Sequence, residues 1–101
     1  MIKNITAETF EQEVLMSSAP VLVDFRAPWC LPCRMLSPTL DVLAKEQPQL
    51  TIAKINVDEQ PELASQYGVM SIPTLMVMEG GKIKHQVSGL QSKSSISRML
   101  T

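Results

Sequence analysis

The chain has 101 residues and a net charge of −1; 45% of its residues are apolar and 19% are charged. This length suits one domain with a single core, residues 1–101, and the near-neutral charge removes the usual electrostatic reason for binding nucleic acid or an anionic membrane surface. No run approaches the roughly 20 apolar residues of a membrane span, and the start MIKNITAETF lacks the layout of a secretory signal. We therefore expect a cytoplasmic protein, although a mature form without its leader would look the same; we also expect a monomer.

Strand-like apolar runs alternate with helical patterns over the first two thirds of the chain. The predicted strands are Ile2–Ile5, Pro20–Phe25 and Thr51–Val57. The predicted helices are Ala7–Met16, capped by Thr6, a second helix from the cysteines to about Lys45, and Pro61–Tyr67, closed by Gly68. The side chains expected to face the core from the first two helices are Phe10, Val14, Met35, Leu36, Leu40, Leu43 and Ala44.

The last third changes to an antiparallel pattern. Strands are predicted at Thr74–Met78 and Ile83–Val87, and Gly80 and Gly81 between them suit a two-residue hairpin turn because both can take positive φ. A final helix, capped by Ser92, is expected to turn inward Ile96, Met99 and Leu100. The order β-α-β-α-β-α-β-β-α predicts an α/β fold, a mixed sheet with helices on both faces. The seven methionines are expected to fill the core.

The only two cysteines lie three residues apart, directly beside the only tryptophan, in APWCLPCRM. One such pair cannot hold a small secreted scaffold together, because its short loop constrains little of the unfolded chain. Structural zinc needs about four ligands. Only Cys30, Cys33 and His85 could serve readily, so a zinc site would need a carboxylate or a second chain, and we expect no metal. The remaining interpretation is a thiol pair kept for its reactivity.

The positions of the two thiols predict different roles for them. Cys30 follows a strand and lies where a helix begins, so unpaired N–H groups and the helix dipole favour its thiolate. Pro32 suits the first helical turn, where its missing N–H is no loss. We predict Cys30 as the exposed nucleophile and Cys33, one turn further in, as the more buried resolving thiol. The alternative is two inert, buried thiols.

Seven stretches occur in order along the chain: VLVDF, WC-x-PC, KINVD, YGV, SIPTL, GGK and VSGL. In this order and at these separations they resemble the thioredoxin family from end to end. The resemblance implies a five-stranded sheet ordered 1-3-2-4-5, reduction of protein disulfides as the activity, and a redox-active disulfide with no bound cofactor. It also implies electrons from NADPH through a thioredoxin reductase, and a cis peptide bond between Ile72 and Pro73, beside the cysteines.

Two charged residues interrupt apolar strands. Asp24 should point to the face opposite Val23 and Phe25, where burial would raise the pKa of its carboxyl. That suits a proton acceptor for Cys33, directly or through a water; the alternative is a carboxylate that caps groups near a strand end. Lys54, flanked by apolar positions on an adjacent parallel strand, could pair with Asp24. The alternative for Lys54 is a solvated side chain at the sheet edge.

The family layout implies an apolar, substrate-binding rim around Cys30. Its expected members are Trp29, Leu31, Pro32, Ile72, Pro73, Gly89 and Leu90. Gly89 would let backbone approach closely, and the Ile72 backbone could pair with an extended substrate strand. Ordinary core packing of Trp29 and a trans Pro73 are the alternatives. The same layout puts His85 in the second hairpin strand, far from the cysteines, which implies a solvated histidine rather than a catalytic one.

Two residues depart from the family pattern. Leu31 stands where the commonest motif has glycine, which puts partner choice and reduction potential in question. Arg26 stands where the family usually has an aromatic residue. Its guanidinium could favour thiolate and pair with Asp24, or it could point to solvent, and Arg34 adds exposed positive charge beside the pair.

The favoured function is a dithiol–disulfide oxidoreductase that reduces protein disulfides. A second interpretation is a disulfide oxidant or isomerase, which would have a much less negative reduction potential. A third is a binding module that docks partners through its rim without turnover. Replacing Cys30 with serine would leave partner binding intact in the third case and abolish function in the first.

Overall fold

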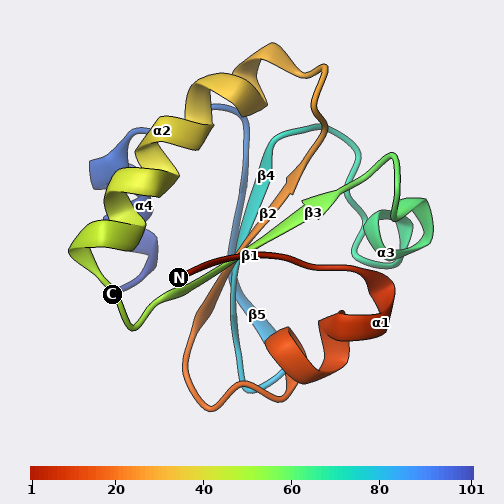
Figure 1. The fold of residues 1–101 in the computed structure, drawn as a ribbon, viewed down its shortest axis with the longest axis horizontal. Helices are drawn as coiled ribbons and strands as arrows, with labels where there is room; N and C mark the ends of the chain where they lie inside the picture. Colours follow the sequence, from red (N-terminus) through yellow and green to blue (C-terminus); the bar gives the residue numbers. More distant parts are fainter.

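A five-stranded mixed sheet forms the middle of the computed structural model, which describes all residues, 1–101 (Figure 1). The strands are β1 (Ile2–Asn4), β2 (Val21–Arg26), β3 (Thr51–Asn56), β4 (Thr74–Glu79) and β5 (Lys82–Ser88). Their order is β1-β3-β2-β4-β5; β3 pairs in parallel with β1 and β2, whereas β4 is antiparallel to β2 and β5. The predicted fold class and strand order are confirmed.

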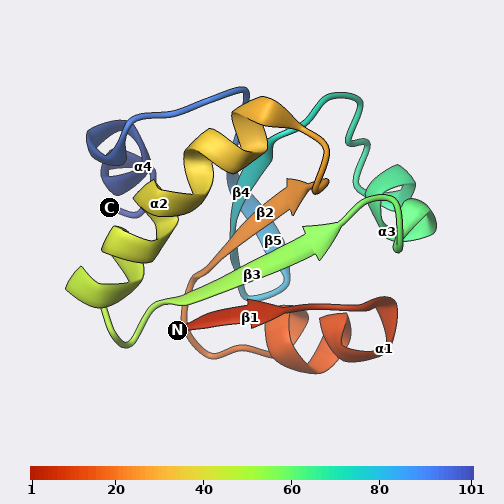
Figure 2. The same cartoon turned by 45° about the horizontal axis from the view of Figure 1, so that its top comes forward.

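Helices cover both faces of the sheet. They are α1 (Ala7–Phe10), which continues into the π-helical segment η1 (Glu11–Leu15), α2 (Leu31–Glu46), α3 (Pro61–Gln66) and α4 (Lys93–Met99). Figure 2 shows α2 and α4 on one side of the sheet and α1 and α3 on the other. The predicted boundaries are confirmed to within one residue, and the second half of the first helix is π-helical. None of the helices combines the length and apolar character that crossing a bilayer requires.

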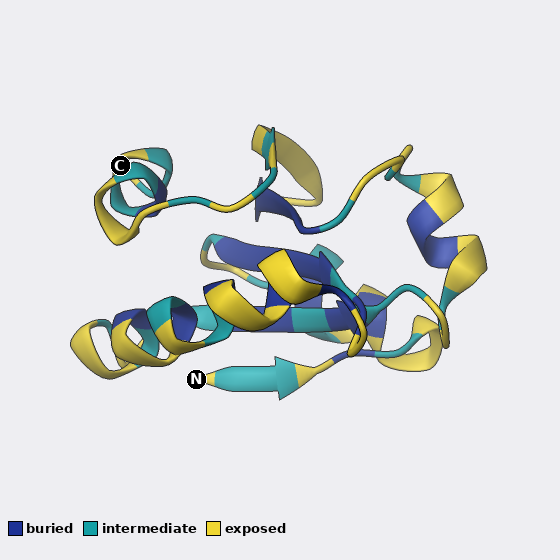
Figure 3. Ribbon diagram, turned by 90° about the horizontal axis from the view of Figure 1, so that it is seen from above, coloured by how far each residue is buried: buried dark blue, intermediate teal, exposed yellow.

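The alternation of side chains along β2 divides the core between the two faces. Val21, Val23 and Phe25 join the cluster under α1, η1 and α3, together with Ile5, Phe10, Val14, Ala53, Ile55, Leu63, Ala64, Met76 and Met78. Leu22 joins the cluster under α2 and α4, together with Leu36, Leu40, Leu43, Leu50, Ile52, Leu75, Val77 and Ile96. The central strands are buried along most of their length (Figure 3). Asp24, two residues after Leu22, therefore belongs to the α2 face.

The predicted two-residue turn joins the antiparallel strands β4 and β5. Gly80 and Gly81 have φ values of 59° and 77°, and Glu79 pairs with Lys82 across the turn. Ser92 caps α4, and its hydroxyl accepts from the N–H of Ser95 over 3.1 Å. Both predictions are confirmed.

The expectation that the methionines fill the core is wrong for most of them. Met76 and Met78 are buried, but Met1, Met16, Met35 and Met70 are exposed. Met35 was also expected on the buried side of α2. The buried residues of that helix are Cys33, Leu36, Leu40 and Leu43, spaced three or four apart. Met35 lies two residues after Cys33, about 200° around the helix, and so faces solvent.

Candidate active site

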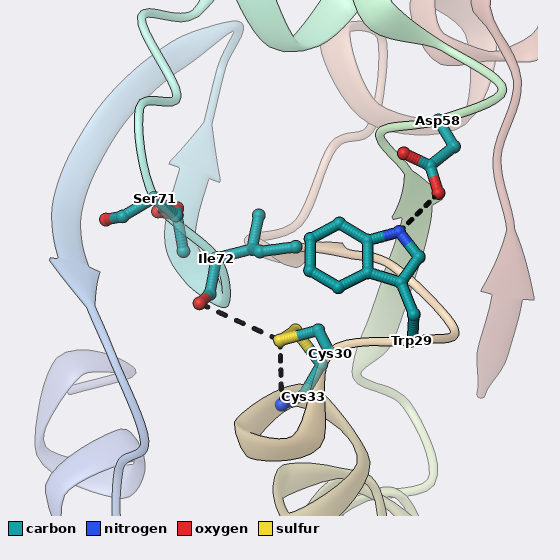
Figure 4. Close-up of a disulfide and its surroundings, with 7 residues drawn as sticks. Trp29, Cys30, Cys33, Asp58, Ser71 and Ile72 are labelled. Carbon is teal, nitrogen blue, oxygen red and sulfur yellow. Dashed lines mark hydrogen bonds between the residues drawn. A yellow bond between two sulfur atoms is a disulfide. The ribbon is translucent and has the colours of Figure 1, made fainter.

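The cysteine pair lies where β2 passes into α2. Cys30 caps the N-terminus of α2 with extended backbone angles (φ −81°, ψ 112°), as the sequence predicts. Cys30 and Cys33 form a disulfide with their Cα atoms 5.2 Å apart. The backbone N–H of Cys33 donates to Cys30 Sγ over 3.3 Å (Figure 4). An otherwise unpaired N–H at the start of the helix therefore already points at this sulfur.

Both cysteines are buried in the disulfide form. Cys30 is 4% exposed and Cys33 is 1% exposed. The predicted order of access holds, but the expectation of an exposed Cys30 is wrong, because Ala27 and Ile72 pack against the pair. Of the two cysteines, Cys30 therefore keeps the slightly larger exposed fraction.

The peptide bond between Ile72 and Pro73 is cis, as the resemblance implies, so the trans alternative is wrong. The Ile72 carbonyl oxygen lies 3.8 Å from Cys30 Sγ (Figure 4). In the disulfide this sulfur has no hydrogen to donate, whereas a Cys30 thiol could donate to the same oxygen. The Pro73 carbonyl accepts from the Gly89 N–H over 2.8 Å, which ties this loop to the end of β5.

The indole of Trp29 lies at the surface rather than in the core. The side chain is 68% exposed, so ordinary core packing is wrong for this residue. Its Nε1–H points away from the disulfide and donates to Asp58 Oδ2 over 2.7 Å (Figure 4). Trp29, Met70 and Ile72 line a shallow hollow on the surface.

Several exposed apolar side chains lie close to the disulfide along the chain or line the hollow beside it. We define the apolar rim as Trp29, Leu31, Met70, Ile72 and Leu90; all except the half-buried Ile72 are exposed. Met70, which is 97% exposed, was missed by the sequence reasoning, although its place directly before SIPTL was a usable signal.

Gly89 has a backbone conformation that favours glycine. Its φ of 91° is one that side chains disfavour. This conformation orients the N–H that bonds to Pro73. A Cβ at this position would meet no atom of the chain within 4 Å, so the close approach of a substrate's backbone to Gly89 stays a prediction.

Asp24 is the one buried ionisable side chain of the sheet. It is 1% exposed, and its Oδ1 has no hydrogen-bond partner. Burial raises the pKa of this carboxyl from its ordinary value of 3.8 to about 6, although the charges of Lys54 and Arg26 oppose the rise. The expectation of a desolvated carboxyl is confirmed. The alternative, a carboxylate that caps nearby groups, is wrong because no such bond exists.

Lys54 is close to Asp24 in the sheet but is not paired with it. The two residues are in register on neighbouring strands, yet no ion pair joins them within 4.0 Å. Instead, the Lys54 ammonium donates to Ser37 Oγ on α2 over 3.0 Å. The alternative of a solvated side chain at the sheet edge is also wrong, because β3 lies between β1 and β2 and Lys54 is half-buried.

Arg26 forms no ion pair with Asp24, so that alternative is wrong. The residue is half-buried, and its Nε is buried without a hydrogen-bond partner. Its effect on the Cys30 thiolate stays a prediction. Arg34 and His85 are exposed, as predicted. No three side chains among His, Cys, Asp and Glu come together in a group that could hold a metal ion.

Comparison with known proteins agrees with this geometry. The family model described as Thioredoxin matches residues 1–101. Thioredoxin 1 of Nostoc sp. (strain PCC 7120) is 50% identical over 97 residues, which cover 95% of this chain and 91% of that protein. Thioredoxin of Streptomyces clavuligerus is 46% identical over 98 residues (97% and 92%), and that of Rickettsia bellii is 46% identical over 97 residues (95% and 92%).

The chain belongs to the thioredoxin family. It is a protein dithiol–disulfide oxidoreductase, a protein-disulfide reductase, and Cys30–Cys33 is its redox-active disulfide. Thioredoxins work through this disulfide without a bound cofactor.

Proposed function

We propose that Cys30 attacks the substrate and Cys33 resolves the intermediate. The Cys30 thiolate forms a bond to one sulfur of a protein disulfide, and the other substrate sulfur leaves as a thiolate that takes up a proton. Cys33 then loses its proton and attacks Cys30 Sγ, which releases the second substrate sulfur. Two electrons pass to the substrate, and the Cys30–Cys33 disulfide remains. The observation that supports this order is the N–H of Cys33 on Cys30 Sγ, which would stabilise a Cys30 thiolate.

Asp24 accepts the proton of Cys33 in this scheme. Cys33 belongs to the buried side of α2, which packs on the α2 face of the sheet, and Asp24 lies on that face. A carboxyl with a pKa of about 6 is largely ionised at neutral pH and is still basic enough to take a proton from a thiol. Its unpartnered Oδ1 leaves an acceptor for the proton, directly or through a water.

Electrons come from NADPH through a thioredoxin reductase, in the cytoplasm. The test is reduction of insulin disulfides with NADPH and a thioredoxin reductase, compared with dithiothreitol as the donor. We expect activity with both donors. We also expect a reduction potential of about −270 mV, the value typical of thioredoxin. Activity with dithiothreitol alone would refute the reductase as donor, and a potential near about −120 mV would instead indicate an oxidant.

Protein disulfides dock on the apolar rim, and the exposed edge of the Ile72 loop pairs with the extended substrate backbone. Leu31 is 64% exposed in the first turn of α2, next to Cys30. We expect Leu31→Ser to raise KM for a protein disulfide about fivefold, the effect of about 1 kcal/mol of lost apolar contact.

Two controls accompany the Leu31 measurement. Reduction of a small-molecule disulfide, which does not reach the rim, should keep its rate in Leu31→Ser. Val42→Ser changes another exposed apolar residue of α2, three turns away, and should leave both reactions unchanged. Equal losses with the protein and the small disulfide would contradict a docking role for Leu31.

A further inference from the structure

A hydroxyl group on α2 binds the lysine that stands beside the buried carboxyl of Asp24 in the sheet. Ser37 lies one helical turn after Cys33, on the side of α2 that turns toward the sheet, and is half-buried. Its Oγ accepts from Lys54 Nζ over 3.0 Å. This is the one side-chain hydrogen bond of Lys54, so the hydroxyl fixes where the ammonium lies.

The position of Lys54 makes this bond consequential. Asn4, Lys54, Asp24 and Leu75 form one row across four strands, and Lys54 stands directly beside Asp24 in it. An unpaired carboxylate and an ammonium on neighbouring strands would ordinarily attract each other into contact, and removal from water strengthens that attraction. Here Asp24 Oδ1 stays without a partner while the ammonium bonds to Ser37.

We propose that Ser37 is a positioning residue for thiol–disulfide exchange: it holds the Lys54 ammonium away from Asp24, so that the carboxylate stays free to take the proton of Cys33. The proposal rests on the proposed role of Asp24 as proton acceptor. A carboxylate in contact with the ammonium would be a weaker base and would lack its free oxygen. Ser37 acts through Lys54 and does not touch the reacting sulfurs in this account.

Few other charges bear on Asp24. Arg26 of β2 is the second cation whose charge lowers the pKa of Asp24. Arg26 is not bonded to Ser37, so a change at Ser37 leaves this effect in place. Opposite Asp24, β4 contributes the apolar Leu75. The charged residues of α2 and α4 are all exposed: Arg34, Asp41, Lys45, Glu46, Lys93 and Arg98. Lys54 is therefore the cation that a change at Ser37 can redirect.

The test follows the carboxyl carbon of Asp24 by ¹³C NMR during a pH titration of the disulfide form. Ser37→Ala frees the ammonium, so the titration midpoint of Asp24 should fall by about one pH unit. Ser37→Thr keeps the hydroxyl and should restore the parental midpoint. In a Lys54→Met background, Ser37→Ala should move the midpoint no further. A parental midpoint in Ser37→Ala, or an equal fall without Lys54, would overturn the proposal.

Kinetics separate this proposal from the role of Asp24 itself. The rate at which Cys33 releases a substrate from the mixed disulfide is measured against pH in the parent and in Ser37→Ala. The acid limb of that profile should move down with the Asp24 midpoint. A shifted midpoint with an unmoved profile would support Ser37 as the residue that holds Lys54 and would refute Asp24 as the proton acceptor.

Discussion

Cys33→Ser should remain covalently attached to its substrate through Cys30. Without Cys33 the mixed disulfide forms, but no neighbouring thiol can break it. A serine hydroxyl does not replace the thiolate, because it stays protonated at neutral pH. Incubation of the reduced variant with excess protein disulfide should give about one equivalent of adduct, whereas turnover falls to the uncatalysed background. Non-reducing electrophoresis and intact-protein mass spectrometry measure both quantities.

Cys30→Ser is the matched control for this experiment. Cys33 is 1% exposed and lies behind Cys30, so the variant that keeps only Cys33 should form almost no adduct. Both variants lose turnover, but only one should trap substrate. Similar trapping by the two variants would show that the thiols are equivalent and would contradict the assigned roles. Partner capture that persists without either cysteine would instead favour a binding module.

The sequence predicts the elements of this fold because their signals are local. Apolar periodicity, caps such as Ser92 and the Gly80–Gly81 turn each depend on neighbours in the chain, and the structure agrees with them closely. The strand order came from the resemblance rather than from periodicity. The predicted burial of Met35 was wrong because apolar character alone does not say where the buried stripe of a helix ends. Cys33, Leu36, Leu40 and Leu43 define that stripe, and Met35 lies outside it.

The parts of the site that escaped prediction depend on contacts between distant residues. Ser37 meets Lys54 across 17 positions of sequence, and Trp29 meets Asp58 across 29. Neither bond leaves a local pattern in the sequence. The first joins helix α2 to strand β3, and the second joins the turn before α2 to the turn after β3. Adjacency on neighbouring strands did predict that Lys54 affects Asp24, but only the structure shows which acceptor the ammonium uses.

The buried carboxyl of Asp24 should make the protein less stable as pH rises. Its pKa is about 6 in the folded protein and 3.8 ordinarily, so between these values the folded state holds a proton that the unfolded state has lost. Stability therefore falls as pH increases through this window. The loss in unfolding free energy is absent below pH 3.8 and complete above pH 6. The difference between the two pKa values corresponds to a loss of about 3 kcal/mol.

Asp24→Asn isolates this cost, because asparagine has nearly the same size and does not ionise. The difference in unfolding free energy between the variant and the parent should change by about 2 to 3 kcal/mol from pH 4 to pH 8, in favour of the variant at the higher pH. Urea unfolding at several pH values measures that difference and cancels the titration of all other groups. A constant difference would mean that the carboxyl titrates normally, which would also deprive Asp24 of the basicity that its proposed part in catalysis requires.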